Sequence, residues 1–171
     1  QVTGANAFSL ATIGQYPIWE LVGPLGFAGA ILLLVSLIAV TPGELGRIPF
    51  DIAEAETELA GGMLVEYSGR NLALFYLGNA IRGFAVLSLV VALFFPYNIG
   101  GALGISAAAG RIAVDAVFFL GKVLAVMFVA VAVVRSAVAR FRVNQASAFY
   151  LVAVTLVSVI GLLLIWADFA L

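Results

Sequence analysis

The chain has 171 residues, of which 64% are hydrophobic and 10% charged, and its mean hydropathy is +1.20. Soluble domains carry about 25% charged residues, so this composition predicts an integral membrane protein. The net charge of -1 offers no basic patch for a nucleic acid, and the absence of Cys and His excludes thiolate and imidazole ligands for metals or iron–sulfur clusters. We therefore expect no cofactor-binding residues and no metal site within this chain.

Four stretches are long and apolar enough to cross a bilayer as helices, which requires about 20 residues. They are residues 21–41, 72–95, 112–138 and 148–166. None alternates polar and apolar residues as a strand would, so the predicted fold is all-α. We expect a single membrane domain over residues 1–171, a bundle of about four transmembrane helices with a structured acidic loop at 42–71. The chain begins with Gln1 and shows no signal peptide, so we expect a processed chain or part of a longer one.

The first connection, residues 42–71, concentrates negative charge. Four of the nine acidic residues, Asp51, Glu54, Glu56 and Glu58, fall within "GRIPFDIAEAETELAGG", residues 46–62. Asp51 and Glu54 have the spacing of a helix capping box. One interpretation is a solvated acidic face, favoured by the helix dipole. The other is a face that meets a basic partner surface or lines a proton path, because like charges four residues apart are otherwise unfavourable.

Three ionisable residues lie inside the predicted spans, where such residues are rare and usually functional. Arg82 lies in the second span, and Asp115 and Lys122 lie in the third. Lys122 is a candidate for a proton or ion relay with Asp115 or a partner's carboxylate; the alternative is an internal ion pair that joins helices. Asp115 also has the four-residue spacing of a surface pair with Arg111. The uncharged connection 96–110, which has four glycines, is expected to be a loop or a short interfacial helix.

The arginines set the expected orientation. Four spans place the connections 42–71 and 139–147 on one side of the membrane, and most arginines lie there or at the adjoining helix ends: Arg47, Arg70, Arg135, Arg140 and Arg142. The positive-inside rule assigns this side to the cytoplasm.

Two segments resemble a known family. "RIPFDIAEAETELAGGMLVEYSGRNLALFYL" is similar to the signature loop of the respiratory complex I subunit 1 family, which includes the membrane anchor subunit of energy-converting, group 4 membrane-bound [NiFe] hydrogenases. "ARFRVNQASAFY", residues 139–150, resembles that family's basic loop between its last two helices. The resemblance covers about residues 20–168, the second half of the family's usual chain.

The resemblance implies a non-catalytic subunit that links a peripheral redox arm to proton or sodium translocation in the plasma membrane of a prokaryote. It implies hydrogenase-like large and small (iron–sulfur) subunits on the cytoplasmic side, which hold the NiFe centre and the clusters, and antiporter-like membrane subunits. The implied junction residues are Glu44, Arg47, Asp51, Glu54, Glu56, Glu58, Glu66 and Tyr67, with an intramembrane relay of Arg82, Asp115 and Lys122. The implied partner-contact residues are Arg70, Arg140, Arg142 and Gln145.

One departure favours a branch of the family. Complex I members carry a further Glu-Tyr where this chain has Asn79 and Ala80 in "LGNAIRGF". The missing carboxylate favours the hydrogenase-like branch, including its sulfur-reducing relatives. The alternative is a quinone-site subunit of a complex I-type NADH, ferredoxin or F420H2:quinone oxidoreductase. An independent transporter and a passive docking scaffold are further alternatives.

Overall fold

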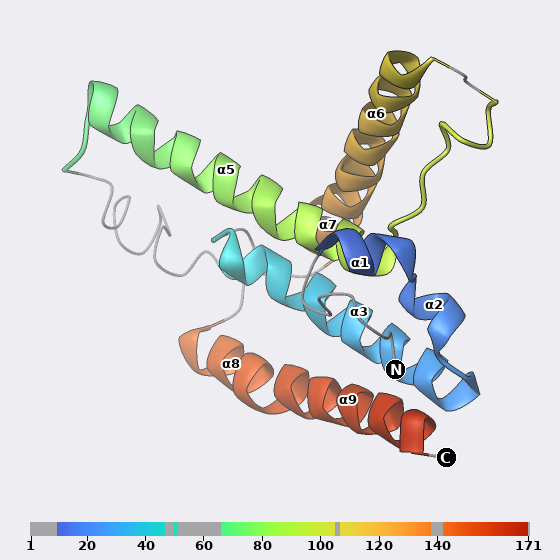
Figure 1. The fold of residues 1–171 in the computed structure, drawn as a ribbon. Helices are drawn as coiled ribbons and strands as arrows, with labels where there is room; N and C mark the ends of the chain where they lie inside the picture. The colour runs from blue at the N-terminus through green and yellow to red at the C-terminus, as the bar shows by residue number, and fades with distance from the viewer. Residues whose placement is uncertain (1–9, 47–49, 51–65, 105–106, 138–141, 171) are drawn as a thin grey trace.

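The structure is a computed structural model that describes residues 10–46, 50, 66–104, 107–137 and 142–170 (Figure 1). Within these ranges every regular element is a helix. The elements are α1 (Leu10–Gln15), α2 (Ile18–Leu21), α3 (Pro24–Glu44), α5 (Gly69–Phe94), α6 (Ala108–Met127), α7 (Val134–Ala137), α8 (Val143–Ala148) and α9 (Thr155–Ala170).

The predicted all-α membrane fold is confirmed. In the described part of the chain, four helical stretches are long and apolar enough to span a bilayer: Pro24–Glu44, Gly69–Phe94, Ala108–Val133 and Asn144–Ala170. The first begins three residues later than expected, because Pro24 occupies the first helical turn, where its missing N–H and fixed φ are favourable. The residues before it form the separate helix α2.

Two spans contain a π-helical segment that the hydropathy pattern does not reveal. Phe128–Val133 joins α6 to α7, and Phe149–Val154 joins α8 to α9. Such wide turns are rare and often occur at functional sites. The hydroxyl of Thr155 donates to the carbonyl oxygen of Tyr150, five residues earlier, at 3.0 Å, and this bond supports the second segment.

Helices α3 and α9 form the tightest pair, and they lie side by side along most of their lengths (Figure 1). A Cβ atom on Gly29 would lie 2.5 Å from the carbonyl oxygen of Gly161, and a Cβ on Gly161 would lie 3.0 Å from that of Gly29. Small residues at a crossing allow this close backbone approach, which drives helix association in lipid. The two glycines therefore set the distance between α3 and α9.

A small apolar core lies where α5, α6 and the π segment after α6 meet α3. Leu87, Val91, Val123 and Ala130 are buried there, and Ile38 packs against them. Most other large apolar side chains lie on the surface of this chain, as expected where lipid or other subunits surround it.

The first half of α5 extends beyond the end of α3, and α6 rises steeply away from the α3–α5–α9 layer (Figure 1). Leu45, directly after α3, lies against Gly83 in the middle of α5, where a Cβ would meet its side chain at 2.9 Å. The end of α3 therefore meets α5 halfway along its length. This offset brings Glu44, the last residue of α3, next to Arg82 in the middle of α5.

We predict that Gly29→Ala destabilises the protein by about 1–3 kcal/mol, because the added methyl must push the backbone of α9 away. Gly121→Ala is the matched control: no atom lies within 4 Å of its Cβ position, and alanine is the better helix former. Thermal unfolding in detergent measures both effects. Equal midpoints for the two variants would contradict the proposed close packing.

Candidate functional site

An ion pair joins the end of α3 to the middle of α5. A guanidinium nitrogen of Arg82 lies 3.4 Å from a carboxylate oxygen of Glu44, and both side chains are 54% exposed. Arg82 belongs to the span Gly69–Phe94, and Glu44 is the last residue of α3. Charged residues within spans usually pair with one another or face a cavity. The structure therefore supplies the intramembrane arginine with a carboxylate from the last turn of α3, which extends into the range 42–71 that the sequence predicts as the first connection.

The two segments that carry the family resemblance meet beside this pair. The ring of Phe50, from the acidic segment, lies 4.6 Å from the ring of Tyr150 and 5.7 Å from that of Phe149, measured between centroids. The hydroxyl of Tyr150 in turn lies against Gly43, one residue before Glu44. Aromatic pairs at these separations stabilise by about 0.5–1.5 kcal/mol beyond their burial. These contacts hold the start of the acidic segment against the end of α3.

A cavity of about 770 Å³ opens at this meeting point, which we call the junction cavity. Its walls come from the end of α3, from Phe50 and from the α8–α9 span. Among the described residues that line it, Glu44 is the charged one, and the side chains with hydroxyl groups are Ser147, Tyr150, Thr155 and Ser158. The described part of the lining therefore combines the Glu44 carboxylate, hydroxyl groups and apolar walls in a single space.

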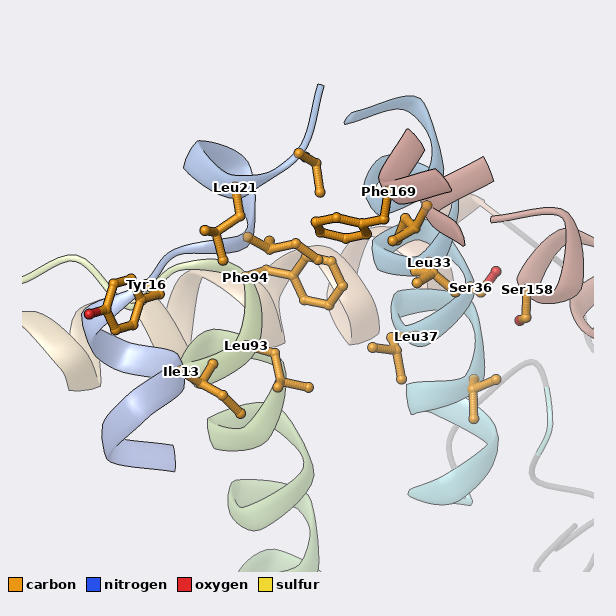
Figure 2. Close-up of a pocket in the computed structure, with 14 residues that line it drawn as sticks. Ile13, Tyr16, Leu21, Leu33, Ser36, Leu37, Leu93, Phe94, Ser158 and Phe169 are labelled. Atoms are coloured by element: carbon orange, nitrogen blue, oxygen red, sulfur yellow. The ribbon is translucent and has the colours of Figure 1, made fainter. Parts of the chain in front are cut away.

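A second cavity, of about 490 Å³, lies closer to the start of α3 than the junction cavity does and is almost wholly apolar (Figure 2). Its walls come from α1, α2, α3, α5 and α9. Ser36 and Ser158 reach it, but their hydroxyls donate to the carbonyl oxygens of Leu32 and Val154 on their own helices, each at 2.8 Å. The described lining of this cavity suits an apolar chain.

Lys122 and Asp115 contact backbone and not each other. Lys122 donates to the carbonyl oxygens of Phe95 and Tyr97, both at 2.7 Å. Asp115 accepts a hydrogen bond of 2.7 Å from the N–H of Gly100 and lies 4.0 Å from Arg111, the pair that their spacing predicts. The expected relay partners are thus both engaged with the connection between α5 and α6. That connection is irregular in its described part, and no helix is described between Phe95 and Ala107.

The remaining predicted site residues fall into two groups. Glu66 and Arg70 are exposed around the start of α5, and the ring of Tyr67 lies 4.8 Å from that of Phe75. Gln145 accepts a hydrogen bond from the N–H of Arg142 at 3.1 Å and so caps α8. The other predicted site residues lie outside the described part of the chain: Arg47, Asp51, Glu54, Glu56, Glu58 and Arg140. Among the described residues, no cluster of three or more His, Cys, Asp or Glu side chains could hold a metal ion.

Sequence reasoning missed two polar contacts at helix ends. Asp168, near the end of α9, accepts a 2.6 Å hydrogen bond from the N–H of Gly23 at the start of α3. The indole of Trp19 donates to the carbonyl oxygen of Phe94, the last residue of α5. A carboxylate at a helix N-terminus is favoured by the dipole, but only the tertiary fold brings Asp168 to that position.

The four apolar spans and the charged junction define a multi-pass membrane protein with a polar site at one end of its α3–α9 pair. Comparison with known proteins gives the family. Residues 2–166 match a family model described as "NADH dehydrogenase". The chain therefore belongs to this family, that of the membrane subunit of complex I-type oxidoreductases, and the resemblance seen in the sequence is confirmed at that level.

Individual relatives agree with this assignment. The chain is 32% identical over 145 residues to a subunit of the NADH-quinone oxidoreductase of Leptospira biflexa, covering 84% of this chain and 39% of the relative. It is 37% identical over 102 residues to "NADH-ubiquinone oxidoreductase chain 1" of Chondrus crispus, covering 57% of this chain and 29% of the relative. It is 53% identical over 55 residues to "Hydrogenase-4 component C" of Escherichia coli, covering 32% of this chain and 18% of the relative. The chain thus spans less than half the length of each of these relatives.

We predict that Glu44→Arg and Arg82→Glu each lower thermal stability, because each leaves two like charges together at the junction. The double exchange restores an ion pair and should recover most of the loss. Exposed pairs contribute up to about 1 kcal/mol, which corresponds to a few degrees in the unfolding midpoint. If the double variant loses as much stability as the two single variants together, the pair does not form.

Proposed function

We propose that the chain is the membrane coupling subunit of a multi-subunit, hydrogenase-like oxidoreductase, in which it links a peripheral redox arm to proton or sodium translocation. The observation that carries this proposal is the Glu44–Arg82 ion pair beside the junction cavity. The pair joins a connection rich in carboxylates to a charge inside a membrane span. The chain itself does no redox chemistry in this proposal; the NiFe centre and the iron–sulfur clusters belong to partner subunits.

The coupling follows from the electrostatics of the junction. A redox step in the peripheral arm changes the charge above the acidic segment, and the field of that charge reaches Glu44 across the junction cavity. A change in this field alters the attraction between Glu44 and Arg82. If the two side chains separate, the guanidinium of Arg82 is left to find another carboxylate. The redox event is in this way converted into a rearrangement of charge within the membrane.

Two observations support the hydrogenase-like branch. The match to Hydrogenase-4 component C has the highest identity of the three relatives described above, although it is the shortest. Asn79 and Ala80 also stand where complex I members are expected to carry a further Glu-Tyr. We place the arginine-rich side in the cytoplasm of a prokaryotic cell, so that the peripheral arm docks over the junction cavity. The proposed docking residues are Arg70, Arg140, Arg142 and Gln145.

A quinone-site subunit is the second candidate, and the junction cavity favours it. Its volume of about 770 Å³ lies in the range of small-molecule sites, and Phe50 and Tyr150 could stack on a planar ring. The two relatives that match this chain over the longer stretches are named as subunits of quinone and ubiquinone oxidoreductases. In that role the chain would wall the headgroup site, with Glu44 beside it.

The native assembly distinguishes the two branches. We predict that the complex purified in mild detergent contains nickel and evolves H2 from a low-potential electron donor. Iron without nickel, together with reduction of a quinone analogue that junction-cavity inhibitors block, would favour the quinone branch. Iron without nickel and reduction of a sulfur compound would point to the sulfur-reducing relatives.

We predict that Glu44→Gln leaves assembly and redox turnover within about twofold of the parent but lowers ion translocation at least tenfold, because glutamine retains the shape but has no negative charge to pair with Arg82. Glu20→Gln, in α2 before the start of α3, is the matched control and should leave translocation unchanged. Translocation in vesicles, measured per electron transferred, tests this. A passive scaffold would instead lose assembly or show no effect on translocation.

A further inference from the structure

The backbone that follows α5 is held by side chains at several points. Trp19 binds the carbonyl oxygen of Phe94, and Lys122 binds those of Phe95 and Tyr97. Asp115 binds the N–H of Gly100. Backbone polar groups outside a helix must find partners inside the protein when they lie at membrane depth. Here the partners are Trp19 of α2 and the side chains of Asp115 and Lys122 of α6.

The environment of the Lys122 ammonium has the features of a monovalent-cation site. Two carbonyl oxygens accept its hydrogen bonds at 2.7 Å, and the rings of Phe118 and Phe119 lie 4.9 Å and 5.9 Å from its nitrogen. Phe95 is the residue that caps the C-terminal end of α5, which carries the negative end of the helix dipole, and Tyr97 follows in the irregular backbone beyond it. Aromatic faces add further attraction for a cation. Each of these groups is neutral, and none can take up the lysine's proton.

Asp115 and Arg111 extend this contact along α6. Positions 111, 115 and 122 fall on one face of a helix, and Asp115 lies about 10 Å from Lys122 along the helix axis. A Cβ on Gly100 would meet both Arg111 and Asp115 at 2.8 Å, whereas one on Gly101 would meet only the flexible end of Arg111 at 3.3 Å. The backbone from Phe95 to Gly100 thus runs along this face of α6, and Gly100 is the point of closest approach.

We infer that the carbonyl oxygens of Phe95 and Tyr97, with the rings of Phe118 and Phe119, form a cation site that the Lys122 ammonium occupies as a tether. Together with Asp115, Lys122 positions the segment 95–100 against α6. The site takes a primary ammonium, which has N–H donors for both carbonyls. Lys122 is accordingly a positioning residue and not a proton carrier, since its proton has no acceptor among the described residues that bind it. This inference does not depend on the proposed function.

The chain has no cysteine, so introduced thiols report on the segment without background from this chain. Ile99→Cys is the reporter, because Ile99 is half-buried within the tethered segment, and Leu103→Cys is the control, because Leu103 is 61% exposed. The maleimide labelling rate is measured in the assembled complex in native membranes. We expect Lys122→Ala to raise labelling of Ile99→Cys about tenfold and to change that of Leu103→Cys little. Unchanged labelling of Ile99→Cys would overturn the inference.

Chemical rescue identifies the ligand class. Propylammonium replaces the part of the lysine side chain that Lys122→Ala removes, so millimolar propylammonium should restore slow labelling of Ile99→Cys. Tetramethylammonium, which has no N–H donor, should not restore it. Equal effects of the two cations, or rescue by neither, would overturn the assignment of an ammonium site.

A second pair of variants keeps Lys122 intact in case its removal prevents assembly. Gly100→Ala should raise labelling of Ile99→Cys, because the methyl displaces the segment from Asp115. Gly101→Ala should leave the rate within about twofold of the parent, because the end of Arg111 can move aside. Equal rates in these two variants would contradict the close approach on which the tethered position rests.

Discussion

The requirement that every backbone polar group at membrane depth has a partner inside the protein governs this structure. Within helices the backbone meets it alone, so the side chains of the four spans can be mostly apolar. Where the helices end, side chains complete the bonding. Asp168 binds the start of α3, Trp19 binds the end of α5, and Lys122 and Asp115 bind the backbone that follows.

This requirement separates the charged residues into two kinds. Asp115, Lys122 and Asp168 hold backbone groups, so a change in their charge would expose unsatisfied donors or acceptors. Glu44 and Arg82 hold each other, and their separation leaves no backbone group unpaired. The Glu44–Arg82 pair is therefore the charged contact best suited to change during a working cycle, and it adjoins the junction cavity.

Helix α3 connects these features. Its glycines set the distance to α9, its first turn receives Asp168, and its last residue reaches Arg82. Because Gly29 and Gly161 pack backbone against backbone, α3 and α9 should move together as one body. A displacement at the junction would then be carried along the pair, whereas α6 packs mainly on α5, and the π segment after α6 meets α3.

The sequence predicts the spans well, because hydropathy averages over many residues and does not depend on which helix meets which. It also identifies Glu44, Arg82, Asp115 and Lys122 as unusual, since charge is rare in such a chain. It does not predict that Lys122 selects carbonyl oxygens over Asp115, because that choice depends on where α5 ends relative to α6. The π segments and the contact of Phe50 with Tyr150 are likewise set by packing between distant segments.

The most direct test of this account is whether the two family segments meet at the junction in the working complex. Phe50→Cys and Tyr150→Cys, introduced together into this cysteine-free chain, should be joined rapidly by a short bis-maleimide in native membranes. Phe50→Cys with Phe169→Cys is the control, because Phe169 lies at the far end of α9 and should not be joined. Cross-linking of the first pair alone is the predicted result. Equal cross-linking of both pairs, or of neither, would contradict the proposed junction.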